Sequence, residues 1–255
     1  MIGKHLSVLG LWVRCSLYKI LGVIAIMGIA EYMLFYFNLK REMTVYEATE
    51  TFSRPEMLID RSGIFICFAA AFVLITLLLI MSGCQFSSKV SYTIKRLGVN
   101  EKYVFLYQCI YNLLIYALLW SVQVILCICM LKSYTAHTPI EFFGEQNIFL
   151  AFYRSTRLHP LLPLSNGILW ARNAVLLVSL ALCTAEFPYQ QRRGKKSVTA
   201  IALMLYTVAL WKQDASTALA CLVSTALIAT VVIVSVCHQV LIKEENGNDS
   251  EEKDY

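Results

Sequence analysis

The chain has 255 residues, of which 58% are hydrophobic and 15% are charged, with a formal net charge of +5. Soluble domains carry about 25% charged residues, so this composition argues against an ordinary water-soluble domain. The small positive charge is concentrated in a few segments between apolar runs. It therefore predicts an oriented membrane protein rather than a nucleic-acid-binding surface.

The N-terminal segment, residues 1–19, is expected to form an amphipathic helix along the membrane surface. Its apolar residues share one side of such a helix: Ile2, Leu6, Leu9, Val13 and Leu17. Arg14 and Lys19 interrupt the apolar run, and no small-residue cleavage site follows the next one. We therefore do not expect a cleaved signal peptide.

Residues 20–242 are predicted to form a transmembrane domain of six helices, so the expected fold class is an all-α integral membrane protein. The predicted spans are Ile20–Asn38, Gly63–Ser82, Val104–Leu131, Gly167–Glu186, Val198–Trp211 and Ser216–Ile242. The third is long enough to tilt or to project from the bilayer, and the fifth is short. Residues 243–255 are acidic and poor in apolar residues, which predicts a disordered tail.

Lysine and arginine set the predicted orientation, because cytoplasmic loops are enriched in these residues. With both termini in the cytoplasm, 13 of the 22 fall on the inner side. These are Lys4, Arg14, Lys19, Lys89, Lys95, Arg96, Lys102, Arg192, Arg193, Lys195, Lys196, Lys243 and Lys253. We expect a multi-pass protein of the bacterial plasma membrane.

The nine cysteines lie almost entirely in or beside apolar runs. The predicted outer loops contain none, so we do not expect a disulfide framework. Cys127 and Cys129 lack the spacing of a metal-binding motif and have no histidine nearby, so no metal site is expected.

Two charged residues fall inside predicted spans. Glu31 lies past the midpoint of the first span, where it either lines a polar path or reaches the outer interface. Arg172 lies a few residues inside the fourth span, from which its long side chain can extend to the outer headgroups. Both would lie in the outer half of the membrane, so a Glu31–Arg172 pair is a further possibility.

Sequence motifs of common enzymes are absent. Gly194-Lys195-Lys196-Ser197 resembles the end of a phosphate-binding loop, but Lys196 stands at the Ser/Thr position and Tyr189 at the first glycine. Neither His-Glu-x-x-His nor Gly-x-Ser-x-Gly occurs. We therefore expect no enzymatic activity and no cofactor bound by this chain.

The basic segment 84–103 connects the second and third predicted spans. A short helix carrying Lys95 and Arg96 is expected to end at Gly98, which favours a helix C-cap. Asn100 can then cap the next helix. The alternative is an ordinary positively charged cytoplasmic loop.

Arg96-Leu97-Gly98-Val99-Asn100, placed between two spans, resembles the cytoplasmic segment of permease subunits of ABC transporters of the ABC-2 type. The predicted six spans, cytoplasmic termini and amphipathic N-terminal helix are similar to that family too, as is the Pro160–Pro163 step before the fourth span. The resemblance implies that Lys95, Arg96, Leu97 and Gly98 dock on a separate ABC ATPase subunit, which binds the ATP. It also implies a second permease chain, identical or different.

Two other functional hypotheses remain open at this point. One is a non-transporting membrane protein that acts as an accessory, immunity or regulatory subunit. The other is an intramembrane hydrolase that uses Glu31 or a histidine. An ATPase that co-purifies with the chain would favour the permease.

Overall fold

The structure is a computed structural model that describes residues 2–49, 53–84, 101–138, 147–155, 157–163, 167–192, 199–210 and 218–237. This part of the chain is helical and contains no strand. Its helices are α1 (Ile2–Thr49), α2 (Pro55–Arg61), α3 (Ile64–Gly83), α5 (Glu101–His137), α6 (Asn147–Arg154), α7 (Leu158–Leu161), α8 (Gly167–Arg192), α9 (Thr199–Leu210) and α10 (Ala218–Cys237).

Four helical segments are long and apolar enough to cross a membrane: Ser16–Glu47, Ile64–Gly83, Tyr103–His137 and Gly167–Gln191. They fall at the first four predicted spans. The fifth and sixth predicted spans correspond to shorter apolar helical segments, Thr199–Leu210 and Leu222–Val234. The described chain is thus all-α, with several helices that have the length and composition of membrane spans.

The first helix differs from its prediction. Residues 1–19 were expected to form a helix separate from the first span, but α1 continues through both without a break to Thr49. The polar stretch after the span is also helical, in the end of α1 and in α2. No glycine or proline occurs between Leu39 and Arg54, so no helix-breaking residue interrupts α1 before it ends at Thr49. At 1.5 Å per residue α1 is about 72 Å long, more than twice the roughly 30 Å of a hydrocarbon core.

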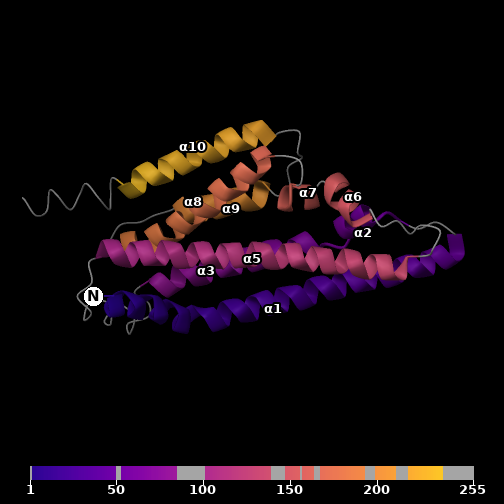
Figure 1. Cartoon of the computed structure of the whole chain (residues 1–255), viewed down its shortest axis with the longest axis horizontal. Helices are drawn as coiled ribbons and strands as arrows, with labels where there is room; N and C mark the ends of the chain where they lie inside the picture. The colour runs from indigo at the N-terminus through magenta and orange to yellow at the C-terminus, as the bar shows by residue number, and fades with distance from the viewer. Residues whose placement is uncertain are drawn as a thin grey trace, which may run out of the picture.

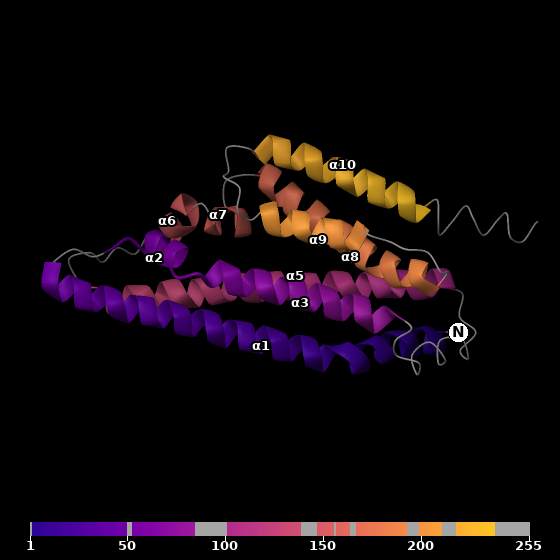
Figure 2. The same cartoon turned by 180° about the vertical axis from the view of Figure 1, so that it is seen from behind.

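The long helices pack in layers (Figure 1). α1 contacts α3 and α5, α5 contacts α8, and α8 in turn contacts α9 and α10. α1 and α10 therefore lie on opposite sides of the bundle, as the reverse view also shows (Figure 2). Their outward faces are apolar, with Ile26 70% and Val231 66% exposed. Such faces are suited to lipid rather than to water.

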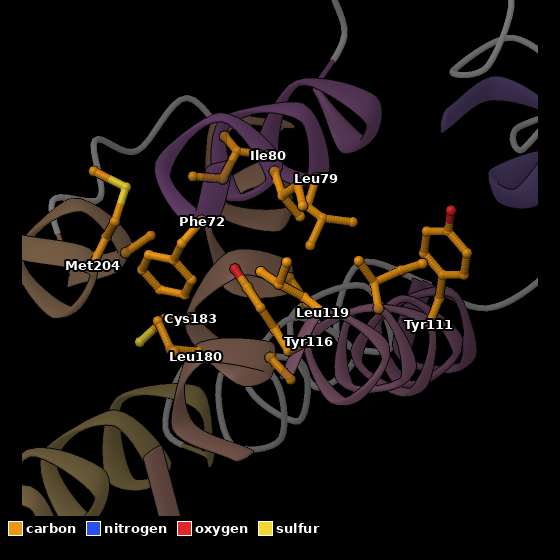
Figure 3. Close-up of a cluster of buried hydrophobic side chains, with 14 of the residues drawn as sticks. Phe72, Leu79, Ile80, Tyr111, Tyr116, Leu119, Leu180, Cys183 and Met204 are labelled. Carbon is orange, nitrogen blue, oxygen red and sulfur yellow. The ribbon is translucent and has the colours of Figure 1, made fainter. Parts of the chain in front are cut away.

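The bundle has a main apolar core between α3, α5, α8 and α9. Figure 3 shows Phe72 and Ile80 of α3 beside Leu119 of α5, Leu180 of α8 and Met204 of α9. The ring centroids of Phe72 and Tyr116 are 5.9 Å apart. This core holds α3, α5 and α8 together at the level of the bundle where their polar side chains meet.

A smaller structure, here called the cap, consists of α2, α6 and α7 at the end of the bundle where α1 ends (Figure 2). It shares a second apolar cluster with α1 and α5, in which Phe35, Ile59, Met130 and Phe152 are buried. The hydroxyl of Tyr134 donates to the carbonyl oxygen of Ser53 over 2.7 Å. The indole Nε1 of Trp120 donates to the carbonyl oxygen of Leu161 over 3.0 Å. The cap is therefore tied to α5 by both apolar packing and hydrogen bonds.

Candidate functional site: a buried polar stripe and an adjoining pocket

Helix α5 carries a row of polar side chains that we call the polar stripe: Gln108, Asn112, Tyr116 and Gln123. Their spacings of four, four and seven residues place them on one face of a helix with 3.6 residues per turn. Three of them are 0% exposed, and Tyr116 is 2% exposed. The stripe therefore runs along α5 inside the bundle and not along its lipid-facing side.

The middle of the stripe joins three helices. The amide Nδ2 of Asn112 donates to Thr184 Oγ1 on α8 over 2.9 Å. The hydroxyl of Tyr116 donates to Thr76 Oγ1 on α3 over 3.1 Å. In Figure 3 Tyr116 is directed toward Phe72, whereas Tyr111 leaves another side of the same helix. Interhelical hydrogen bonds of this kind hold helices together where lipid gives no hydrophobic driving force.

Glu31 of α1 meets the stripe at Gln123. The amide Nε2 of Gln123 donates to Glu31 Oε2 over 2.9 Å, and Glu31 is 0% exposed. Glu31 lies about half-way along the apolar segment Ser16–Glu47, well away from either end. Among the described residues, neither Glu31 Oε1 nor Gln123 Oε1 has a hydrogen-bond partner. Of the two interpretations of Glu31, this geometry favours a polar group inside the bundle, which is where functional acids of membrane proteins usually lie.

Arg172 has other neighbours. It is 4% exposed, and its Nε and Nη2 donate to Asn173 Oδ1 over 3.3 and 3.1 Å. Asn173 Nδ2 in turn donates to the carbonyl oxygen of Pro160 over 2.8 Å. Arg172 thus lies where α8 meets the cap, whereas Glu31 is bonded to α5, and the structure does not join the two as a pair.

The other end of the stripe is tightly packed. Gln108 lies where α3 ends and α5 begins, beside Gly83 and Pro188. A Cβ atom added to Gly83 would lie 2.3 Å from Gln108 Nε2 and 2.5 Å from Pro188 Cγ. Neither polar atom of the Gln108 side chain has a hydrogen-bond partner among the described residues. Nearby on α8, Gln190 Nε2 donates to Glu186 Oε1.

Several predicted features lie outside the described residues. These are the coupling residues Lys95, Arg96, Leu97 and Gly98, nearly all of the loop 84–103, and the acidic tail 243–255. The six cysteines for which the structure gives a state are free thiols: Cys67, Cys84, Cys109, Cys127, Cys129 and Cys183.

A pocket of about 690 Å³, part of which is open to the surroundings, adjoins the stripe at Tyr116. Its walls are mostly aromatic and aliphatic: Phe65, Phe68, Phe72, Leu119, Trp120, Pro160, Leu161, Leu176, Leu177 and Leu180. Tyr116, Arg157, Asn173 and Thr207 supply its polar groups. The Arg157 guanidinium lies 5.7 Å from the centroid of the Phe65 ring.

The sequence interpretation identified Glu31 but missed its partner and the stripe. The signal was available, because three amides and a tyrosine separated by four, four and seven residues project onto one helix face. No pattern in the sequence indicated the pocket, because its walls come from α3, α5, α8, α9 and the cap.

Comparison of the chain with protein-family models, with curated proteins and with solved structures gave no match.

Proposed function

We propose that this chain is the membrane-spanning, permease-like subunit of an ABC transporter of the ABC-2 type. It would cross the membrane six times with both termini in the cytoplasm and would work with a separate ATPase and a second permease chain. The observation that carries the proposal is the polar stripe, a line of three buried amides and one buried tyrosine on a helix long and apolar enough to span the membrane. Polar groups in such segments are costly and typically mark substrate or ion pathways.

The stripe offers hydrogen-bonding capacity that the described residues leave unused. Asn112 Oδ1, Gln123 Oε1 and both polar atoms of Gln108 have no partner among those residues. A buried polar atom without a partner costs about 1–3 kcal/mol. A substrate or water that entered between the helices would satisfy these atoms and offset that cost. The stripe would then form one wall of the translocation path.

Coupling to ATP hydrolysis would enter through residues 84–103. Lys95 and Arg96 would make charge-assisted contacts to acidic groups of the ATPase. This segment is continuous with the end of α3 and the start of α5. Gln108 follows the first residue of α5 by about 10 Å along the helix axis. Movement of the segment would therefore reach the stripe through two short, rigid helix ends.

Affinity purification of the tagged chain from its native host tests the partnership. We expect a stoichiometric ATPase to co-purify with the wild type and to be lost from the double variant Lys95→Glu/Arg96→Glu. The matched control is Lys132→Glu/Arg154→Glu, which makes the same charge change at two exposed positions near the cap. Loss of the ATPase from both variants, or from neither, would contradict a specific coupling role for Lys95 and Arg96.

A second experiment tests the path. Asn112→Leu removes an amide of the stripe while keeping a similar volume, so ATPase binding should persist while ATP-dependent transport falls.

The accessory or regulatory alternative draws support from the cap, which presents exposed Arg54 and Met57 beyond the bundle. Recovery of the chain with another membrane protein and without any ATPase would favour that alternative.

A further inference from the structure

We infer that the pocket between α3, α5, α8, α9 and the cap binds an amphiphile with an acyl chain and a phosphate headgroup. The chain would lie between the aromatic and leucine side chains, and Arg157 would hold the phosphate. This inference goes beyond the permease proposal. It is tested by binding alone, so it stands or fails separately from any ATPase.

The pocket walls fit an acyl chain. Phe65, Phe68 and Phe72 follow one another along α3, and Leu176, Leu177 and Leu180 face them from α8. The seven-residue interval from Phe65 to Phe72 spans about 10 Å of helix. A pocket lined over this length of helix takes part of a chain, and the rest would extend toward the bilayer. Apolar walls with few polar groups are typical of pockets that bind small apolar molecules.

The polar end of the pocket fits an anion. Among the described residues that line the pocket, Arg157 is the one with a full charge. No described side chain accepts a hydrogen bond from its guanidinium, which lies over the Phe65 ring and interacts electrostatically with Asp60. A guanidinium presents paired donors that match a phosphate, and this contact strengthens where water is scarce.

Asp60 weakens the attraction between Arg157 and a phosphate but does not cancel it. Its carboxylate accepts a hydrogen bond from Ser155 Oγ over 3.4 Å, and it is not among the residues that line the pocket. The acid is therefore not part of the pocket wall, whose described residues are mostly apolar. Tight binding needs both parts of the ligand. A free phosphate would contact only one cation, Arg157, and an uncharged chain would leave that cation without a partner.

Thermal unfolding in a maltoside detergent separates these possibilities. The probes are 1-palmitoyl-lysophosphatidylglycerol, which has chain and phosphate, glycerol 3-phosphate, which lacks the chain, and monopalmitoylglycerol, which lacks the phosphate. We expect a concentration-dependent rise in Tm with the first probe and a much smaller rise with the other two, because ligand that binds only the folded state stabilises it.

Substitutions at Arg157 and Leu176, with Arg154 as the control position, locate the binding. Arg157→Gln should weaken lysophosphatidylglycerol binding roughly ten-fold, the loss of one charge-assisted hydrogen bond. Arg154→Gln removes the same charge from an exposed position on α6 and should bind as the wild type does. Leu176→Trp should reduce binding by filling the pocket. If that variant does not fold, Arg157→Lys supplies the second measurement, because it keeps the charge and should restore part of the affinity.

Equal stabilisation of the wild type and Arg157→Gln would overturn the inference, since the pocket cation would then have no role. Equal stabilisation by lysophosphatidylglycerol and monopalmitoylglycerol would do the same, because it would reflect general detergent-like binding. A response to glycerol 3-phosphate as large as that to the full probe would identify a phosphate site and exclude an acyl-chain pocket.

Discussion

The carboxyl of Glu31 and the amide of Gln123 form a polar contact between α1 and α5. One hydrogen bond of 2.9 Å joins them, and each retains an oxygen without a partner among the described residues. Removing one member of a buried polar pair costs more than replacing both, because the remaining group keeps its desolvation penalty.

This asymmetry predicts a double-mutant cycle. Gln123→Leu should lower the unfolding free energy by about 1–3 kcal/mol, because it leaves Glu31 without its donor. Glu31→Leu should also lower it, because it leaves Gln123 Nε2 without its acceptor. Glu31→Leu/Gln123→Leu should recover part of the loss. The measurement is denaturant or thermal unfolding of the four proteins in one detergent, and strictly additive costs would show that the contact contributes nothing.

Gly83 allows α3, α5 and α8 to approach closely at one end of the stripe. Gly83→Ala should destabilise the protein by about 1–3 kcal/mol, because the added methyl would overlap Gln108 and the ring of Pro188. Gly22→Ala is the matched control, since nothing lies within 4 Å of a Cβ at that position on α1. Thermal unfolding of both variants checks the prediction, and a Gly83→Ala protein as stable as the control would contradict the packing.

At the scale of elements, the stability of the cap depends on polar contacts that lie near its buried apolar cluster. Burial raises the pKa of Asp60 in α2 above its ordinary value, while the Arg157 charge and the Ser155 hydroxyl oppose the shift. A carboxyl with a raised folded-state pKa favours folding in its neutral form. That contribution is complete below the pKa of the unfolded chain and is lost as the pH rises through the folded pKa.

Asp60→Asn should therefore raise the Tm at a pH above the folded-state pKa of Asp60, where the charged form opposes folding, while keeping an acceptor for Ser155. The difference between the two proteins should shrink as the pH falls toward about 4, the ordinary range of an aspartic acid. Glu47→Gln, at an exposed position on α1, is the matched control for the loss of one carboxylate. A constant gap between wild type and Asp60→Asn across this range would rule out the titration of Asp60 as its cause.

At the scale of the whole molecule, the orientation and the six crossings remain predictions that labelling can test. In a cysteine-free background, Arg154→Cys and Lys212→Cys should react with a membrane-impermeant maleimide in intact cells. Lys95→Cys should react only after permeabilisation, because basic segments stay on the cytoplasmic side. Labelling of Lys95→Cys alone in intact cells would reverse the orientation. Labelling of Lys212→Cys only after permeabilisation would show that the hairpin between α9 and α10 does not cross.

The sequence by itself determined the helical segments with the character of membrane spans, because an apolar run of sufficient length is a local property of the chain. α3, α5 and α8 begin and end within a few residues of the predicted spans, apart from the extra turns at the ends of α5 and α8. Local propensity also governs the continuation of α1 to Thr49. The predicted first span ended at Asn38, whereas polar residues without glycine or proline readily extend a helix.

Only the tertiary structure decided which helix faces meet. Glu31 and Gln123 are 92 residues apart, and Asn112 and Thr184 are 72 apart, so no local pattern could pair them. The pocket likewise exists only where five elements come together. In a bundle with apolar surfaces on every side, hydropathy does not distinguish a face that meets protein from one that meets lipid. Packing and interhelical hydrogen bonds make that choice, and they depend on the whole fold.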